Sequence, residues 1–71
     1  KVQEFLGLDV TNLENLDELY DILQAYPGDI QVFVKKDGKK FKLNAKVRNC
    51  KGLITELLSI LEEQDIIFFN K

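Results

Sequence analysis

The stretch Ile30–Val47, IQVFVKKDGKKFKLNAKV, holds the clearest structural signal in the chain. Apolar side chains occupy every second position on both sides of Asp37-Gly38. Alternation with a period of two buries one face of a strand and leaves the other face in water. An Asp-Gly step supplies the positive φ angles of a tight hairpin turn. We therefore predict an antiparallel hairpin whose outer face is basic.

Length and composition limit the class of protein. The chain has 71 residues, of which 45% are apolar and 31% are charged. This composition predicts one small globular domain over residues 1–71, and no apolar run approaches the ~20 residues that a membrane span needs. The sequence starts at Lys1, with neither an initiator Met nor a signal-peptide pattern. We expect the domain to be excised from a larger chain.

The residues suited to catalysis or metal binding are few. Cys50 is the only cysteine and there is no histidine. An internal disulfide is therefore impossible, and carboxylates with one thiol make a poor zinc site. Arg48 and Lys51 would favour the Cys50 thiolate, but without a histidine we interpret Cys50 as a small apolar residue at the start of a helix. The sequence predicts no catalytic residue, no cofactor and a reducing, cytoplasmic setting.

Charge is unevenly distributed along the chain, whose net charge is −2. Residues 1–30 carry one Lys against seven acidic residues, and residues 52–71 carry one Lys against four. Between them, residues 31–51 carry eight Lys or Arg against a single acidic residue. A basic hairpin in an acidic domain can attract phosphate or an acidic partner. The candidate nucleic-acid-binding residues are Lys35, Lys36, Lys39, Lys40 and Lys42, and the alternative is a solvated edge strand.

The segment before the hairpin predicts a strand and a helix. Residues 2–10 alternate as a strand. A capping box at Thr11–Glu14, or a second one formed by Asn15 and Glu18, starts an amphipathic helix. Pro27 ends this helix at about Tyr26, and we expect the following residue, Gly28, to take a left-handed turn.

The segment after the hairpin predicts a second helix and a last strand. Asn49 is a plausible cap, and the helix is expected to close over residues 62–65. Residues 66–69, IIFF, are β-branched and aromatic as in a strand. The order βαββαβ predicts an α+β domain with a ferredoxin-like split βαβ arrangement, in which a four-stranded antiparallel sheet carries both helices on one face.

This arrangement leaves one face of the sheet uncovered. We expect the helices to be faced by Val32, Val34, Phe41 and Leu43. Alternation then places Phe33 on the opposite face with Phe5 and either Ile67 or Phe69. Exposed apolar patches mark interaction sites, so the candidate protein-binding residues are Phe5, Phe33 and Phe69. A stacking platform for single-stranded nucleic acid is the alternative, although the strand Lys39–Asn44 lacks an aromatic-x-aromatic signature.

The residues from Leu16 to Val32, the basic strand Lys39–Leu43 and the closing Ile/Phe strand together resemble a known family. They are similar to the extreme C-terminal segment of the bacterial replicative DNA polymerase III alpha subunit. The resemblance covers about residues 13–69. Its most telling part is the helix that ends in Tyr26-Pro27-Gly28-Asp29 and is followed directly by a Val-rich strand.

The resemblance implies a non-catalytic role within a DNA-directed DNA polymerase, a nucleotidyltransferase whose metal-binding aspartates lie in a distant palm domain. In this chain Asp29, Asp37 and Asp65 occur singly on predicted turns and cannot converge on two metals. In the family, the C-terminal region comes after an oligonucleotide-binding domain along the chain. It is implicated in binding the tau subunit of the clamp loader. The expected partners are tau and neighbouring domains of the same chain, with weak nucleic-acid contact and no membrane.

Two alternatives concern short segments. A direct single-stranded nucleic-acid binder would use residues 35–42 with Phe33. The run Gln64–Phe68, QDIIF, resembles the short peptide that docks in the pocket of a bacterial sliding clamp. That docking needs an exposed, extended peptide, whereas we expect these residues to form the last strand.

Overall fold

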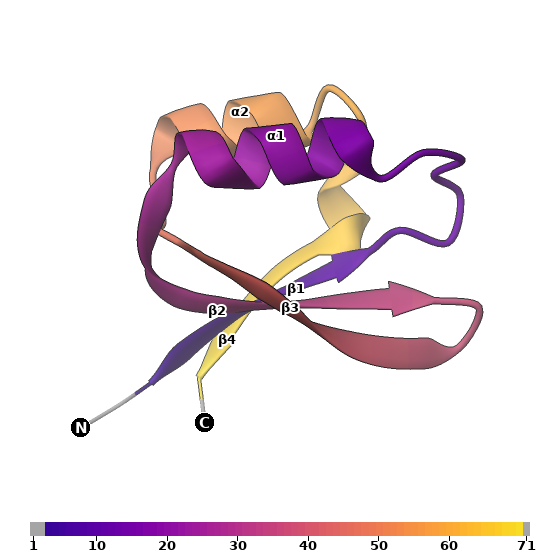
Figure 1. Ribbon diagram of the computed structural model, residues 1–71, viewed down its shortest axis with the longest axis horizontal. Coiled ribbons are helices and arrows are strands. Elements are labelled where there is room, and N and C mark those ends of the chain that lie inside the picture. Colours follow the sequence, from indigo (N-terminus) through magenta and orange to yellow (C-terminus); the bar gives the residue numbers. More distant parts are fainter. Residues whose placement is uncertain (1–2, 71) are drawn as a thin grey trace.

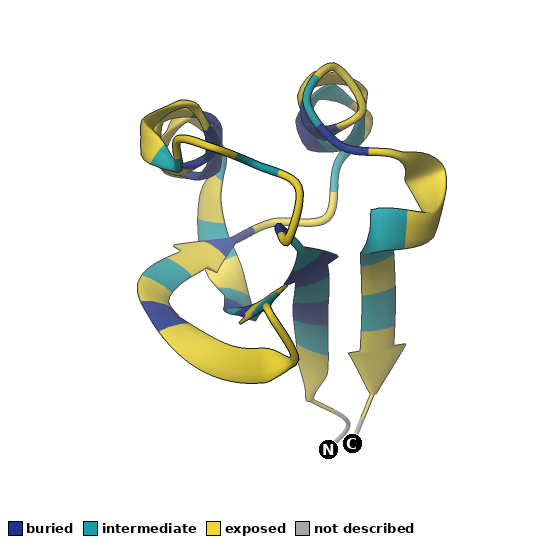
Figure 2. Cartoon of the chain, turned by 90° about the vertical axis from the view of Figure 1, so that its right-hand side faces the viewer, coloured by how far each residue is buried: buried dark blue, intermediate teal, exposed yellow. Residues whose placement is uncertain are grey.

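A computed structural model describes residues 3–70 of the protein. Within these residues, four strands, two α-helices and one short 3-10 helix follow each other (Figure 1). Their bounds are β1 (Glu4–Asp9), α1 (Asp17–Ala25), β2 (Pro27–Lys36), β3 (Lys39–Val47), α2 (Lys51–Leu57), η1 (Glu63–Asp65) and β4 (Ile66–Asn70). Both α-helices cover the same face of the sheet (Figures 1 and 2). The predicted α+β class and the order of strands and helices are confirmed.

The sheet is mixed, so the prediction of a purely antiparallel ferredoxin-like sheet is wrong. The strand order is β3-β2-β1-β4. Strands β1 and β2 are adjacent and parallel, whereas β1 pairs with β4, and β2 with β3, in antiparallel fashion. In a split βαβ unit another strand separates the two strands that a helix joins. Here α1 connects two strands that pair directly, and β3 lies at the sheet edge.

The sequence of β3 gives a physical reason for its edge position. Four of its nine residues are lysines: Lys39, Lys40, Lys42 and Lys46. All four are exposed, and lysine on an edge strand prevents unwanted pairing with other chains. By contrast, the central strand β1 buries Leu6 and Leu8 completely against the helices. A lysine-rich strand at the edge keeps its ammonium groups hydrated, which a central position would make harder.

The core lies between the sheet and the two helices, which contact each other. It consists of aliphatic side chains from every α-helix and from β1, β2 and β3, joined by Val10 and Leu61 from the connecting segments. The expectation that Phe41 belongs to this core is wrong, because its side chain is 50% exposed. Phe41 pairs with the buried Val34 and so lies on the helix side, but near the hairpin turn, whereas the core residues of β3, Leu43 and Val47, lie further along the strand.

The turn between β2 and β3 forms as predicted. Asp37 and Gly38 have φ angles of 53° and 78°, the left-handed values that a type I′ hairpin turn requires. Lys36 pairs with Lys39 directly across the turn. Further along, the register shifts between Gln31 and Phe33, where β3 carries extra residues. The hairpin therefore bends strongly at this point, several residues from its turn (Figure 1).

The first helix starts later than its earlier capping box predicts. It begins at Asp17, whose amide donates to Oδ1 of Asn15 over 2.8 Å. Thr11 does not cap this helix; instead its amide and hydroxyl both donate to the Asp9 carboxylate. The left-handed turn expected at Gly28 is also absent, because Gly28 lies within β2, and among the described residues only Asp37 and Gly38 have positive φ.

Gly28 is needed for a close approach of two backbones. A β-carbon at this position would lie 2.5 Å from the carbonyl oxygen of Val47 and 2.6 Å from the amide nitrogen of Arg48. At this point the Arg48 amide donates to the carbonyl of Tyr26 over 3.1 Å. The glycine therefore lets the start of β2 pass directly against the end of β3.

The second helix is shorter than predicted. It ends at Leu57, and residues 58–61 form turns before η1. The Glu62 amide donates to Oδ2 of Asp65 over 3.2 Å, and the Asp65 amide donates to the Glu62 carbonyl over 2.9 Å. This acidic turn replaces the expected last turn of a longer helix and leads directly into β4, which forms as predicted.

Candidate functional site

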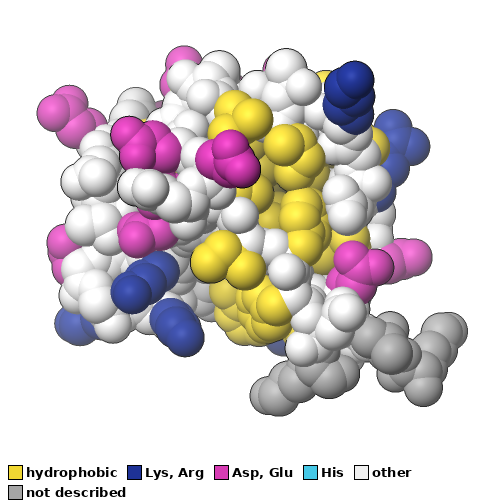
Figure 3. Space-filling view, turned by 180° about the vertical axis from the view of Figure 1, so that it is seen from behind, with side chains coloured by type: hydrophobic (Ala, Val, Ile, Leu, Met, Phe, Trp, Pro, Cys, Tyr) yellow, Lys and Arg dark blue, Asp and Glu magenta, His cyan; other side chains and the backbone are white. Residues whose placement is uncertain are grey.

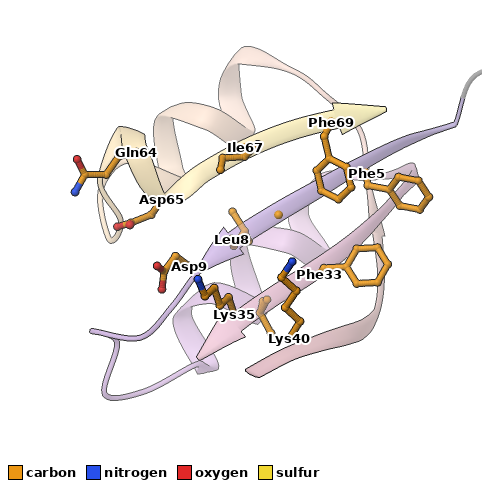
Figure 4. Close-up of a pocket in the computed structure, with 12 residues that line it drawn as sticks. Phe5, Leu8, Asp9, Phe33, Lys35, Lys40, Gln64, Asp65, Ile67 and Phe69 are labelled. Carbon is orange, nitrogen blue, oxygen red and sulfur yellow. The ribbon is translucent and has the colours of Figure 1, made fainter. Parts of the chain in front are cut away.

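Three phenylalanines gather on the outer face, defined as the sheet face opposite the helices (Figure 4). The ring centroids of Phe5 and Phe69 are 5.4 Å apart, those of Phe5 and Phe33 are 5.5 Å apart, and those of Phe33 and Phe69 are 6.5 Å apart. These separations are typical of favourable aromatic pairs. The prediction that these three side chains share one face is confirmed.

Strand register explains why the rings meet. Phe5 on β1 is directly opposite Phe69 on the antiparallel β4. Phe33 on the other neighbour, β2, pairs with Gly7, two residues along β1 on the same face. Ile67 on β4 is opposite Gly7 from the other side, so both Ile67 and Phe69 lie on the outer face. Each of three adjacent strands thus contributes at least one large apolar side chain.

Gly7 forms the floor of a hollow between these side chains. It carries no side chain at the centre of the sheet, and a β-carbon there would lie 3.3 Å from Cε1 of Phe69. The Phe69 ring therefore leans over the glycine. A glycine inside a strand often marks a place where another group approaches the backbone. That signal was present in the sequence, although Gly7 was not among the predicted site residues.

The hollow is open and has a volume of about 540 Å³. One end is aromatic, and the opposite end is polar and charged (Figure 4). Its lining includes Phe5, Phe33, Ile67 and Phe69 at the first end and Asp9, Lys35, Lys40, Gln64 and Asp65 toward the second. Ile67 and Phe69 are 56% and 40% exposed. The site can therefore accept a large apolar group next to a polar one.

Asp9 keeps a negative charge at the polar end. The Thr11 hydroxyl donates to Oδ1 of Asp9 over 2.7 Å, and the Thr11 amide donates to the same oxygen over 3.1 Å. These hydrogen bonds, with a smaller contribution from the positive charge of Lys35, lower the pKa of the Asp9 carboxyl. Asp9 and Lys35 are register partners on β1 and β2, so opposite charges stand side by side here.

The structure divides the predicted basic residues into two groups. Lys35 and Lys40 line the hollow, and Lys42 is the register partner of Phe33. Lys36 turns to the helix side, where its ammonium donates to the carbonyl of Leu13 over 3.2 Å. Lys39 is the partner of Lys36 across the hairpin turn. Only Lys35, Lys40 and Lys42 are therefore grouped with the aromatic cluster.

Gln31 is a buried polar residue that the sequence pattern placed on a solvated face. Its side chain is 8% exposed, and its amide nitrogen donates to the carbonyl of Leu43 over 2.6 Å. This bond spans the irregular part of the β2–β3 ladder. Gln31 therefore supports the site by holding β3 against β2 next to Phe33.

The run Gln64–Phe68 does not form an exposed, extended peptide. It spans the end of η1 and the start of β4. The aliphatic Ile66 and the aromatic Phe68 pack against the core cluster. The prediction that this run is a strand is confirmed for residues 66–68 only, because Gln64 and Asp65 belong to η1. Of the side chains that the clamp-docking pattern uses, Phe68 packs against the core, whereas Ile67 is exposed.

Other chemical features within residues 3–70 are limited. This part of the chain contains no cluster of three or more acidic, Cys or His side chains suited to a metal ion. Cys50 is a free thiol at the start of α2 and packs against the core. Neither α-helix in the same residues is long and apolar enough to cross a membrane.

The fold and the site define a small α+β domain with a mixed four-stranded sheet and an aromatic hollow on its uncovered face. Comparisons with protein-family models, with curated protein sequences and with solved structures gave no match.

Proposed function

We propose that this domain is a non-catalytic protein-interaction module whose binding site is the hollow on the outer face. The observation that supports this proposal is the grouping of Phe5, Phe33 and Phe69 around that hollow, with ring centroids 5.4 to 6.5 Å apart. Apolar groups gathered on a surface and rimmed by polar residues are typical of binding sites for other proteins.

Aromatic side chains in such a hollow can supply much of the free energy of binding. Fully burying one large apolar side chain is worth roughly 1.5–3 kcal/mol. Binding energy in protein interfaces concentrates in a few central residues, often aromatic. The polar end of the hollow, with Asp9 and Lys35, would then determine the orientation of the bound segment.

The sequence resemblance suggests which system the module serves. We propose that the chain is the C-terminal segment of a bacterial replicative DNA polymerase alpha subunit. Its partners would be the tau subunit of the clamp loader and neighbouring domains of the polymerase. The domain would then tether the polymerase to the replisome, while catalysis takes place elsewhere in the parent chain.

Isothermal titration calorimetry with a C-terminal fragment of a bacterial tau subunit tests this proposal. We expect binding to the wild-type domain that changes little between low and high salt, because apolar contacts release few counterions. Phe33→Ala should weaken binding about tenfold or more. Phe41→Ala is the matched control, because Phe41 is an exposed phenylalanine that lies on the helix side, away from the hollow. Absence of binding, or equal losses in both variants, would contradict the proposal.

A second candidate function is binding of single-stranded nucleic acid. The observation that favours it is the position of Lys35 and Lys40 in the same hollow as the phenylalanine rings, with Lys42 opposite Phe33. Bases can stack on aromatic rings while ammonium groups contact phosphates. Affinity for an oligonucleotide should then fall steeply with added salt. A flat salt dependence would argue against this function.

A further inference from the structure

The outer edge of β4 differs from the other edge of the sheet. Strand β4 pairs with β1 on one side only, because it is last in the strand order. Its five residues, IIFFN, include no charge, whereas β3 at the opposite edge carries four lysines. Natural edge strands usually carry charges or prolines that prevent pairing with another chain. Strand β4 lacks both devices.

Apolar side chains flank this edge on both faces of the sheet. On the outer face, Ile67 and Phe69 are 56% and 40% exposed. On the helix side, a second hollow lies between α2 and β4 and includes Ile54, Leu58 and Phe68. Leu58 is 45% exposed. Figure 3 shows hydrophobic side chains in one continuous band on the side of the molecule that Figures 1 and 2 assign to α2 and β4.

The free edge of β4 can accept an additional strand. Successive side chains of an added strand point alternately to the two faces of the sheet. Apolar side chains of the added strand would therefore lie against Ile67 and Phe69 on the outer face and toward the second hollow on the helix side, while its backbone would pair with the free groups of β4. Edge addition of this kind is a recurrent mode of protein recognition.

We propose that the strand added to β4 is the β4 strand of a second copy of this chain, so that the domain forms a symmetric dimer. In an antiparallel pair centred on Phe68, Ile67 of each copy is opposite Phe69 of the other. Both residues lie on the outer face, so a two-fold axis normal to the sheet keeps all four α-helices on one side. This symmetry places the two exposed Leu58 side chains toward each other.

The composition of β4 favours a second copy over a different protein. The paired surfaces are self-complementary, because Ile67 opposite Phe69 is a favourable aliphatic–aromatic cross-strand pair and no like charges within β4 oppose each other.

Sedimentation equilibrium over micromolar to millimolar concentrations tests the dimer. We expect the mass of the wild-type domain to rise from 8.2 kDa toward twice that value. Leu58→Lys and Ile67→Lys should remain near 8.2 kDa. Phe41→Lys is the control, because it places the same charge on an exposed apolar residue of the other edge strand, and it should dimerise like the wild type. Circular dichroism establishes that each variant is folded.

Isotope-filtered NOE spectra of a mixture of labelled and unlabelled domain test the register. Cross-peaks between Ile67 of one copy and Phe69 of the other are expected. A wild-type mass of 8.2 kDa at all concentrations, or equal loss of dimer in Phe41→Lys, would overturn the proposal. So would a dimer without these cross-peaks. Leu58→Lys leaves the outer hollow intact, so loss of the dimer is distinguishable from loss of partner binding.

Discussion

The ring of Tyr26 lies against Gly52 so closely that a β-carbon at position 52 would be 2.9 Å from both Cε1 and the hydroxyl oxygen of the tyrosine. Tyr26 follows the last residue of α1, and Gly52 is in the first turn of α2. The Tyr26 hydroxyl also lies near Glu56, one turn further along α2, and the interaction with that carboxylate raises the pKa of Tyr26. This contact joins the two helices above the sheet.

The Tyr26 hydroxyl should titrate at unusually high pH. Its interaction with Glu56, and to a lesser degree desolvation, raises the pKa of Tyr26. Ultraviolet titration of a Tyr20→Phe variant isolates Tyr26, and Glu56→Ala in that background should lower its midpoint. A group with a raised pKa in the folded state stabilises the fold below its unfolded pKa and loses this contribution as pH rises through the folded value. An unchanged midpoint in Glu56→Ala would contradict this account.

Gly28→Ala should destabilise the domain by about 1–3 kcal/mol. Its β-carbon would meet the backbone of Val47 and Arg48 at 2.5 to 2.6 Å, and backbone cannot move aside without breaking the β2–β3 ladder. Gly52→Ala is the comparison, because there the obstacle is a tyrosine ring that can rotate away. Urea unfolding should show the larger loss for Gly28→Ala, and the reverse order would be inconsistent with this geometry.

Thr11→Val should raise the pKa of the Asp9 carboxyl toward its ordinary value. The variant removes the hydroxyl that donates to Asp9 and leaves the backbone amide bond in place. Because the pKa of Asp9 is depressed in the folded state, its contribution to stability is present above the unfolded pKa and is lost as pH falls through the folded pKa. Carbon-detected NMR titration of the Asp9 carboxyl measures the shift, and an identical midpoint in both proteins would refute the assigned cause.

Filling the hollow should weaken partner binding without unfolding the domain. Gly7→Val places a branched side chain on the floor of the hollow, where the nearest obstacle is the movable and partly exposed Phe69 ring. We expect roughly tenfold weaker binding of the tau fragment, the loss produced by about 1.4 kcal/mol. The thermal midpoint should stay near that of the wild type. Unchanged affinity in a folded Gly7→Val variant would place the binding site elsewhere.

Local sequence patterns predicted the elements but not the order of the strands. The Asp37-Gly38 turn and the alternation in β2 and β3 are signals within one hairpin, and they were correct. Whether β3 lies between β1 and β2 or outside β2 depends on contacts between distant segments. The lysines of β3 favour a solvated edge strand, but the ferredoxin-like arrangement inferred from the βαββαβ order places this strand inside the sheet.

The candidate site was only partly predictable for a related reason. Alternation assigns a side chain to a face of the sheet, and it placed Phe5 and Phe33 correctly. It does not determine how far a side chain is buried, so it missed the exposure of Phe41 and the burial of Gln31. Both errors arise at the β2–β3 hairpin, where the shifted register and the strong bend depend on backbone contacts across the sheet.

The most direct test of the central claim is an amide NMR titration of the isotope-labelled domain with a C-terminal fragment of tau, followed by a short single-stranded oligonucleotide. We predict salt-independent shifts at Phe5, Gly7, Phe33 and β4 on addition of tau. No response to tau, together with salt-sensitive shifts along residues 35–42 on addition of the oligonucleotide, would contradict it and favour nucleic-acid binding.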